Sequence, residues 1–481
     1  MYLMDFYLIN KIWFNYAINK KVYMNSFLNN NFIKDYDNQH FLHPWEDCRT
    51  DNSEYKIITN SNGIYLFDEN GKKYIDGPGG MWCVNLGYGR KEIAKEIAEQ
   101  CEKLSYFSPW FATSEPSVLL AKKISTLTPK DLNTVFFTTC GSTALDSAVR
   151  FVHYYFNSLN KGEKKTIIAR EKGYHGSTLL SASISGKERD KRVLDTIVSG
   201  IKFLSDVNPN LRDKCSEEEW CHQKVSELEN TILEIGPNKV AAFVAEPVLA
   251  SGGVIIPPKG YHKKTYEICK KYNVLYISDE VVTAFGRLGH WFSSEDVFDF
   301  TPDIITCAKG LTSGYIPMGA TIISDSLIED IKKSTYTNDL LFSNGFTYSG
   351  HPIASAAALK TIEIIEEEKI LDHVRNVTPY FQYRLKKLGE KYDCIGDARG
   401  IGLLGCLEGY SNPSLDEKKR LEIDHHFGSL IDNAAEKRGL LVRPIINMCV
   451  FSPPLIINKS EIDLMFDILD DAVSEVEKNL K

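Results

Sequence analysis

The chain has 481 residues and a mass of 54.4 kDa, of which 43% are hydrophobic and 25% charged, so it is long enough for two domains of ordinary composition. Its net charge of -8 and pI near 5.9 argue against a surface for nucleic acid or for an anionic membrane. No segment approaches the ~20 consecutive apolar residues that a membrane-spanning helix needs.

The first part of the chain, residues 1–32, is rich in aromatic residues and asparagine and contains no arginine. It lacks the apolar core of a signal peptide and the Arg/Ser content of a transit peptide, so we expect a poorly ordered extension, with Met24 as an alternative start. The eleven cysteines form no CxxC pair, and several lie in apolar runs, which favours reduced thiols. We therefore expect a cytoplasmic protein, with a mitochondrial location as the alternative because of the extension.

Regular elements are expected from about residue 57 onward. A hairpin is predicted over 57–67 around the turn residues Asn60–Gly63, followed by a strand at Lys73–Asp76. From about residue 113, strands and helices alternate, which predicts βαβ units and a mostly parallel sheet. The expected strands are Val135–Phe137, Thr166–Ala169, Val240–Ala245, the two runs that lead to Asp279 and Lys309, and Ala320–Ile323. The expected helices are Ser117–Leu127, Thr143–Phe156, His262–Lys271 and Ile353–Glu368, and the remainder mixes charged helices with short strands at Gly402–Leu407 and Leu440–Arg443.

Two apolar runs end in ionisable residues that should lie side by side. One run, beginning at Leu275, ends at Asp279, and the other, beginning at Asp303, leads to Lys309. Ligands of open parallel sheets bind at the carboxyl ends of the strands. A lysine for a Schiff base and a carboxylate for the pyridine nitrogen are what pyridoxal phosphate (PLP) requires. Taken singly, the aspartate also fits a strand cap and the lysine a solvated loop.

Two further segments fit the same ligand. A turn between the strand at Val135 and the next helix contains Gly141, where the backbone can approach a phosphate closely, and Ser142 and Thr143, whose hydroxyls can help to bind it. The Gly173–Gly176 loop holds Tyr174 and His175, and one of these rings can stack on a ligand. Ser/Thr caps and aromatic loop residues are also common without any ligand.

Taken together, these residues resemble a class III, fold-type I PLP-dependent aminotransferase, closest to the omega-amino acid:pyruvate and diamine aminotransferases. The resemblance runs from about His40 to Ile457. Its markers, in the family's order, are Asp76-Gly77, Trp82–Gly89, Cys140–Ser142, Tyr174–Gly176, Ala245–Val248, Asp279–Thr283, Lys309-Gly310, Gly345–Pro352, and Arg443 ahead of Pro453-Pro454. The resemblance implies an α/β fold with a mostly parallel central sheet in a large domain and a smaller α+β domain built from N- and C-terminal segments. The implied boundaries are 1–32 for the extension, 33–76 and 351–481 for the small domain, and 77–350 for the large PLP-binding domain.

The resemblance also implies a role for each matching residue. Catalysis would rest on Lys309, as the Schiff-base lysine and proton shuttle, and on Asp279. The cofactor would be held by Gly141, Ser142, Tyr174, His175, Glu246, Asp279, Val281, Lys309 and, from the neighbouring subunit, Thr347. The substrate would be bound by Trp82 and Arg443, with Trp110 or Phe111 and Phe346 arriving from the partner. No metal site is implied, and the assembly would be a homodimer, with a tetramer as the alternative.

The implied reaction is a ping-pong transfer of an amino group from an omega-amino acid or amine of the β-alanine, γ-aminobutyrate or diamine type to pyruvate or glyoxylate. Three alternatives stay open: 2-oxoglutarate as acceptor, which would need a second cation; an aminomutase or decarboxylase on the same scaffold; and a non-catalytic descendant. Five positions depart from the common family pattern and bear on substrate identity: Cys140, Thr143, Leu249, Ala284 and Asn344.

Overall fold

A computed structural model of the protein describes residues 30–51, 55–212, 214–336, 339–409 and 417–480. The predicted extension at 1–32 lies almost entirely outside the described residues. The chain forms two compact units, 1–61 with 65–74, and 62–64 with 75–481, and each is considered by itself.

The smaller unit contains helix α2 (Asn30–His40) and the strands β1 (Ile58–Asn62), β2 (Tyr65–Asp68) and the first half of β3 (Lys73–Asp76). The hairpin is present, but its turn comes later than expected, because β1 continues through Asn62. Gly63, with φ +59°, and Ile64 make the turn instead. The next turn is closed by the Asp68 carboxylate, which accepts hydrogen bonds from the backbone N–H of Asn70 and from the Tyr74 hydroxyl at 2.9 Å each.

The larger unit is built on a seven-stranded sheet in the order β4-β10-β9-β8-β7-β5-β6. Only β10 runs antiparallel to its neighbours, so the expectation of a mostly parallel sheet is confirmed. The connection 308–318 between β9 and β10 is too short for the crossover that a parallel pair needs. The strands are β4 (Leu132–Thr138), β5 (Thr166–Arg170), β6 (Ile201–Leu204), β7 (Val240–Ala245), β8 (Leu275–Asp279), β9 (Ile304–Cys307) and β10 (Gly319–Ser324).

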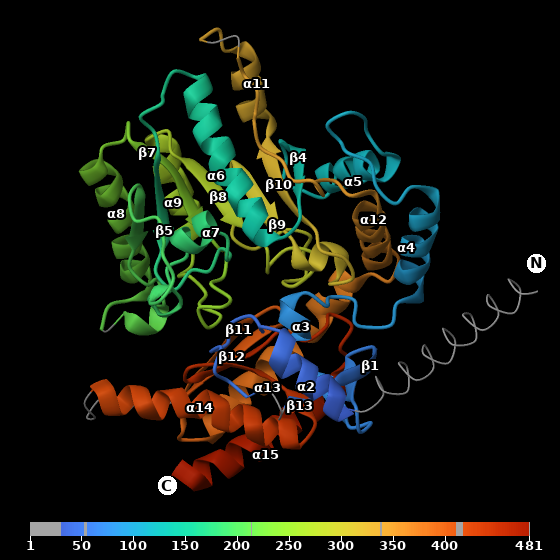
Figure 1. The fold of residues 1–481 in the computed structure, drawn as a ribbon. Helices are drawn as coiled ribbons and strands as arrows, with labels where there is room; N and C mark the ends of the chain where they lie inside the picture. Colours follow the sequence, from blue (N-terminus) through green and yellow to red (C-terminus); the bar gives the residue numbers. More distant parts are fainter. Residues whose placement is uncertain (1–29, 52–54, 213, 337–338, 410–416, 481) are drawn as a thin grey trace, which may run out of the picture. The chain divides into compact units, whose positions relative to one another are not determined.

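Helices cover both faces of this sheet (Figure 1). Helix α6 (Gly141–Ser158) packs on one face, and α8 (Glu217–Ile235) and α9 (Tyr261–Lys271) pack on the other. Within β8 the side chains alternate, because Leu275 and Ile277 join the core under α6 while Tyr276 joins the core under α8 and α9. A strand buried on both faces reads as a continuous apolar run, which is why these strands were visible in the sequence.

Shorter helices and turns complete this part of the unit. They are α3 (Gly79–Trp82), α4 (Lys91–Lys103), α5 (Glu115–Ser125), α7 (Leu179–Ile184), α10 (Ser293–Asp296), α11 (Asp325–Lys333), α12 (Pro352–Glu367) and the 3₁₀ turns η2 (Glu188–Lys191), η3 (Pro209–Leu211) and η4 (Lys309–Thr312). Helix α12 packs against α4, α5 and η4, so it supports the turn that carries Lys309.

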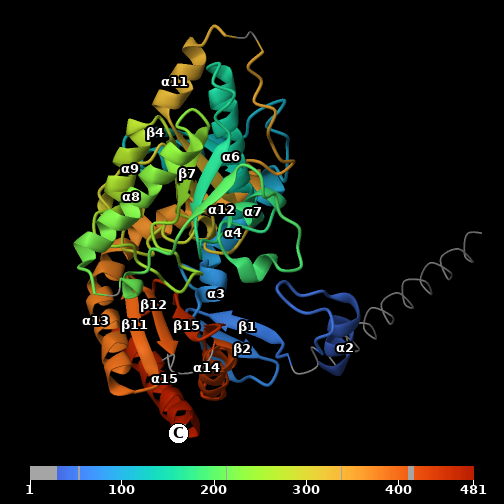
Figure 2. The same ribbon diagram turned by 90° about the vertical axis from the view of Figure 1, so that its left-hand side faces the viewer.

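The C-terminal part combines an antiparallel sheet with three long helices (Figure 2). The sheet has the order β11-β12-β15-β14, and α13 packs on β11 and β12. Gly402, with φ +58°, makes the turn between β11 and β12, which shifts the strand expected at Gly402–Leu407 by two residues. The elements are α13 (Ile370–Lys391), β11 (Ile395–Ile401), β12 (Leu404–Gly409), α14 (Glu417–Lys437), β13 (Leu440–Leu441), β14 (Arg443–Ile445), β15 (Met448–Phe451) and α15 (Lys459–Leu480).

Strand β13 is separate from that sheet and pairs in parallel with Ile75 and Asp76 of β3. The mixture of strands and helices expected for this region is present, whereas the division into domains at residues 77 and 351 stays a prediction. Of the helices within the described ranges, none combines the length and the apolar character that crossing a membrane requires.

Candidate active site

The ends of strands β8 and β9 bring Asp279 and Lys309 to one edge of the sheet. The two strands are parallel neighbours, and Asp279 lies opposite Thr306 in their register. Asp279 follows Leu275 and Ile277 at every second position, so its side chain lies on the face covered by α6. Lys309 begins η4 with φ +45°, an uncommon conformation for a residue with a side chain. Such outliers cluster at functional sites.

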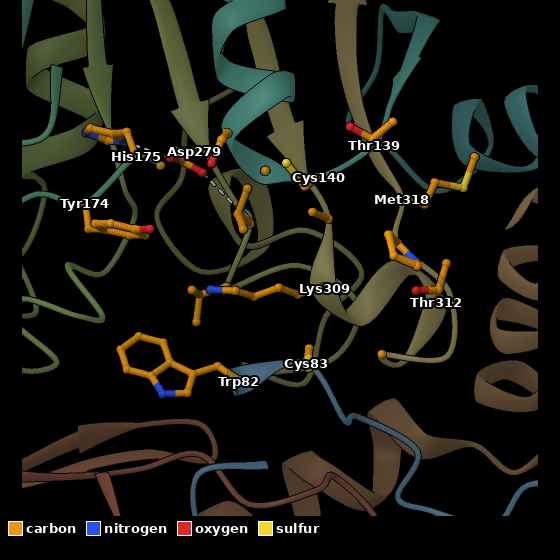
Figure 3. A pocket seen from close by; sticks show the side chains of 18 of the residues that line it. Trp82, Cys83, Thr139, Cys140, Tyr174, His175, Asp279, Lys309, Thr312 and Met318 are labelled. Carbon is orange, nitrogen blue, oxygen red and sulfur yellow. Dashed lines mark hydrogen bonds and ion pairs between the residues drawn. The ribbon is translucent and has the colours of Figure 1, made fainter. Parts of the chain in front are cut away.

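A cavity of about 340 Å³ opens between these two residues and the start of α6. Figure 3 shows the Lys309 side chain reaching into it, with Trp82 on one side and Tyr174, His175 and Asp279 on the other; His175 and Asp279 are joined by a hydrogen bond. Its lining includes eight of the residues expected to bind the cofactor, Gly141, Ser142, Tyr174, His175, Glu246, Asp279, Val281 and Lys309, together with Trp82. The volume lies within the range of small-molecule sites, roughly 300–1,000 Å³.

Both carboxylate oxygens of Asp279 are fixed by hydrogen bonds. One lies 2.7 Å from Nδ1 of His175, and the other accepts from the Thr306 hydroxyl at 3.1 Å and from the Val281 backbone N–H at 3.2 Å. Asp279 and His175 are both buried. His175 lines the cavity and holds Asp279 in place. Of the two rings in this loop, Tyr174 is therefore the one that we expect to stack on a ligand.

Glu246 lies behind Tyr174 and is buried. Its carboxylate accepts from the backbone N–H of Tyr174 at 2.9 Å and from that of Ala250 at 3.2 Å. Burial, followed by the nearby negative charge of Asp279, raises the pKa of Glu246, while His175 opposes the shift. This carboxyl group anchors the loop that positions Tyr174.

Lys309 is an amine in surroundings that disfavour its charge. Burial lowers the pKa of Lys309 below that of an ordinary lysine, and Asp279 opposes the shift. Its Nζ lies 5.3 Å from the centre of the Trp82 ring. The neutral amine, the form that acts as a nucleophile and a base, is therefore favoured relative to a lysine in water.

The N-terminus of α6 forms the polar end of the cavity. At Gly141 an added Cβ would lie 2.9 Å from Val281, so only glycine lets the helix start approach that side chain so closely. The Ser142 hydroxyl accepts from the Ser177 backbone N–H at 3.0 Å and can still donate. Thr143, whose hydroxyl was expected to assist, instead caps the helix, since it accepts from the Cys140 N–H at 3.0 Å and donates to the Cys140 carbonyl.

Arg443 also lies beside Trp82. Its guanidinium carbon is 6.0 Å from the centre of the indole, and its Nε is buried without a hydrogen-bond partner among the described residues. Burial lowers the pKa of Arg443, and the nearby Tyr174 opposes that shift. A half-buried guanidinium whose Nε has no partner is costly, and a carboxylate ligand would satisfy it.

Five expected site residues do not line this cavity of the chain that carries them: Arg443, which lies beside Trp82, and four others. Trp110 and Phe111 are 73% and 82% exposed, Thr347 is exposed, and Phe346 is half-buried. Trp110 packs over Gly345, where an added Cβ would lie 3.3 Å from the indole nitrogen, and the Tyr106 hydroxyl donates to the Thr347 carbonyl. The roles of these four stay predictions that need a second subunit.

Sequence reasoning missed two residues that matter to the site. Thr306 fixes Asp279, and its signal was a hydroxyl two residues after Ile304 in an otherwise apolar strand. Ser251 lines the cavity with a buried, unpartnered Oγ, and nothing in its Gly-rich turn distinguished it.

The residues present fit PLP. The start of α6 and Ser142 can hold a phosphate, and the fixed carboxylate of Asp279 can face a ring nitrogen. The cradle at Gly141, which a Cβ would fill, and the unpartnered Ser251 hydroxyl both belong to this cavity. No group of three or more His, Cys, Asp or Glu side chains that could hold a metal ion was found among the described residues. The fold and the site define an enzyme of the PLP-dependent transferase class.

Comparison with known proteins narrows that class. The family model for class-III aminotransferases matches residues 49–473, and the chain belongs to this family. A putrescine–pyruvate aminotransferase of Pseudomonas aeruginosa is 39% identical over 430 residues, which are 88% of this chain and 92% of the relative. The mitochondrial gamma-aminobutyrate transaminase 1 of Oryza sativa subsp. indica is 40% identical over 429 residues, 88% of this chain and 82% of the relative.

Solved structures agree with the fold. The omega-transaminase of Pseudomonas jessenii in complex with PMP superposes with a TM-score of 0.87 at 33% identity, covering 92% of this chain and 98% of that one. The (S)-enantioselective omega-transaminase of Thermomicrobium roseum gives a TM-score of 0.87 at 32% identity, covering 93% and 99%. The protein is a PLP-dependent aminotransferase of fold-type I.

Proposed function

We propose that this aminotransferase moves an amino group from an omega-amino acid or omega-amine to pyruvate or glyoxylate. The observation that carries the proposal is the arrangement around Trp82, whose ring has the Lys309 amine at 5.3 Å and the Arg443 guanidinium at 6.0 Å. An apolar surface between an amine and a carboxylate receptor suits a substrate with a methylene stem. The names of the two curated relatives, a putrescine–pyruvate aminotransferase and a gamma-aminobutyrate transaminase, support the same substrate class.

The chain's own residues divide the chemistry among them. PLP, when bound, supplies an electrophilic aldehyde and an electron-withdrawing ring. Lys309 would attach to the cofactor and, once freed, remove and return the proton at the reacting carbon. Asp279, fixed by His175 and Thr306, would keep the ring nitrogen protonated, while Val281 and Tyr174 would hold the ring from its two faces.

At the two ends of the site, polar groups fix orientation. Gly141, Ser142 and the α6 N-terminus would hold the phosphate. Arg443 would bind the carboxylate of the oxo acid in a two-point contact, because its guanidinium has no competing partner among the described residues. Trp82 would exclude water beside the reacting carbon.

We propose further that the protein works as a homodimer. Seven apolar or aromatic side chains on the segments 104–111 and 341–348 are exposed: Leu104, Tyr106, Phe107, Trp110, Phe111, Leu341 and Tyr348. Exposed apolar patches of this kind mark interfaces. A second copy covering them would bring Thr347, Trp110, Phe111 and Phe346 toward the partner's cavity.

A substrate panel tests the proposed reaction. Purified enzyme should show a visible absorbance band from bound PLP that bleaches with an omega-amino acid or diamine and returns on addition of pyruvate or glyoxylate. Bleaching without recovery by any oxo acid would contradict a transaminase and favour an aminomutase or a decarboxylase. Recovery with 2-oxoglutarate alone would replace the proposed acceptor with the runner-up.

For the location, we propose the cytoplasm. None of the eleven cysteines, all of which lie within the described residues, forms a disulfide, which suits a reducing compartment. The rice relatives named as mitochondrial make the mitochondrion the alternative. Imaging the full-length chain beside a version that starts at Met24 distinguishes the two, since only a targeting segment would make their distributions differ.

A further inference from the structure

A second cavity of about 430 Å³ adjoins the first and shares one wall residue with it. Ser251 lines both cavities, and its buried hydroxyl has no hydrogen-bond partner among the described residues. The second cavity is walled by the loop around Lys187, by Gly252, and by Ile445 and Met448 of the C-terminal sheet. A substrate that extends away from Lys309 past Ser251 would therefore enter this space.

One cation on this wall differs from the others. Lys172 is paired with Asp206 at 2.7 Å, Arg189 with Asp190 at 3.0 Å, and Arg399 with Asp397 at 2.6 Å and with Glu408. The Lys187 carbonyl accepts from the Asp190 backbone N–H at 3.1 Å, but its side-chain amine makes no hydrogen bond and no ion pair with any residue that the structure describes. Its Nζ lies 5.5 Å from the centre of the Tyr174 ring, the ring that borders the first cavity.

The backbone that carries Lys187 is fixed. Gly186 bridges to Glu171 at the end of β5, and an added Cβ at Gly186 would lie 2.1 Å from the Arg170 carbonyl oxygen. Lys187 itself precedes the turn η2 with extended backbone angles. The backbone next to Lys187 is therefore tightly packed, and the Lys187 amine lies beside Tyr174.

The positive charge of Arg443 helps to lower the pKa of Lys187, so the two side chains repel each other. Lys187 lines the second cavity, and Arg443 begins the strand β14 whose Ile445 lines it too, so two cations without ion pairs among the described residues lie at or next to this wall. Burial lowers the pKa of Lys187 to about 8, with Asp190 and Glu246 opposing the shift and Arg189 and Arg443 adding to it. The other charged groups on this wall are Glu171, Glu188, Glu408, Lys172 and Arg399.

We propose that Lys187 is a second carboxylate-binding cation, which acts with Arg443 and selects donors that end in a carboxylate over donors that end in an ammonium. This deepens the proposed function and rests on it, because it names omega-amino acids rather than diamines as the donor class. A distal carboxylate would supply the partner that both cations lack. A distal ammonium would meet two like charges in a partly buried space, where repulsion is weakly screened.

The test compares Lys187→Met with Lys187→Arg and with the control Lys172→Met, which removes a cation that is already paired on the same wall. For Lys187→Met we expect kcat/KM to fall by about tenfold for an omega-amino acid, because its distal carboxylate loses one charge contact. We expect kcat/KM to rise for a diamine of matching length, because its distal ammonium is no longer repelled by Lys187. Lys187→Arg should retain the wild-type preference, and Lys172→Met should change it by less than about twofold.

Binding gives a second readout that does not depend on turnover. Pentanoate, which has the carboxylate and stem of an omega-amino acid but no amine, is titrated as an inhibitor at pH 7 and pH 9. Lys187 is charged below its pKa and neutral above it, so wild-type affinity should fall by about fivefold across this interval. Lys187→Met should bind weakly at both pH values and Lys187→Arg tightly at both, since arginine stays charged.

The outcomes separate the two proposals. An enzyme that transfers no amino group from any omega-amine refutes the proposed function. An active enzyme in which Lys187→Met leaves both the donor ratio and the pH dependence of pentanoate binding unchanged refutes the role of Lys187 alone. Equal losses for amino acids and diamines would mean that Lys187 only supports Tyr174, which also overturns the inference.

Discussion

At the scale of single residues, Lys309 combines a strained backbone, a cavity and a lowered pKa. Lys309→Ala should keep the cavity and bind PLP without a covalent link, and transamination should fall by several orders of magnitude, because attachment and proton transfer are both lost. The measurement is the turnover rate together with the absorbance of the bound cofactor. Near-normal turnover would refute the whole assignment of the site.

Asp279 is held by three hydrogen bonds, and an asparagine of the same shape would keep its place but not its charge. Asp279→Asn should still bind PLP yet lose most activity, because a neutral amide cannot stabilise a protonated pyridine. Steady-state kinetics of the purified variant, with PLP content measured in parallel, give the result. A drop of only about threefold would mean that this aspartate merely caps its strand.

Arg443 should matter only where a substrate has a carboxylate to bind. Removing one partner of a partly desolvated ion pair costs on the order of 2–5 kcal/mol. Arg443→Ala should therefore depress kcat/KM for pyruvate and for an omega-amino acid, yet leave the half-reaction with a simple aralkyl amine within about tenfold of wild type. Half-reactions can be followed separately by cofactor absorbance, and equal losses for both donors would make Arg443 structural.

At the scale of elements, the sequence pattern identified strands and helices, because these depend on the order of neighbouring residues along the chain. Buried parallel strands such as Val240–Ala245 were predicted with their observed limits, because both faces are apolar. The turn around Asn60 was placed too early, because turn-forming residues are compatible with an exposed strand such as β1. Contacts between distant segments, such as His175 with Asp279, leave no periodic trace in either segment.

Charge pairing was equally invisible to sequence. The sequence does not single out Lys187. This lysine differs from Lys172 only in the structure, where both line the second cavity but only Lys172 forms an ion pair. The two residues look alike in a list of charged positions. Only the fold shows which lysine is already neutralised.

The turn after β9 makes an element-scale prediction. A Cβ at Gly310 would lie 2.3 Å from Nδ2 of Asn85, which donates to the Phe285 carbonyl and whose Oδ1 accepts from the buried Arg287. Gly310→Ala should lower the free energy of unfolding by about 1–3 kcal/mol, the usual cost of overpacking. Gly162→Ala is the control, since its new methyl group would meet only Asn157 at 3.4 Å. Chemical denaturation of the two variants compares them, and equal stability would mean that Asn85 yields without loss.

At the scale of the whole molecule, the proposed homodimer predicts that a second chain completes each site. The cavity of one chain is lined by Lys309 and Asp279, whereas Thr347 is exposed elsewhere on the surface. If the interface proposed for the exposed aromatic residues forms, each dimer has two equivalent sites with Thr347 supplied across it. Loss of Thr347 should then weaken PLP binding by about tenfold or more, as expected for a hydrogen bond to a charged group.

Mixing two defective subunits tests that arrangement directly. Lys309→Ala lacks the reactive amine, and Thr347→Ala, at limiting PLP, lacks the phosphate contact. In a mixed dimer, the site on the Thr347→Ala chain has its own Lys309 and the intact Thr347 of the other chain, so it is complete. Unfolding and refolding an equal mixture should yield about half mixed dimers, and hence about a quarter of the wild-type sites, although each variant alone is nearly inactive under these conditions.

If Thr347 instead acts within its own chain, no combination is complete and mixing restores no activity. A mixture of Lys309→Ala with Asp279→Asn is the control, because both residues belong to one chain's cavity and every site in that mixture carries a defect.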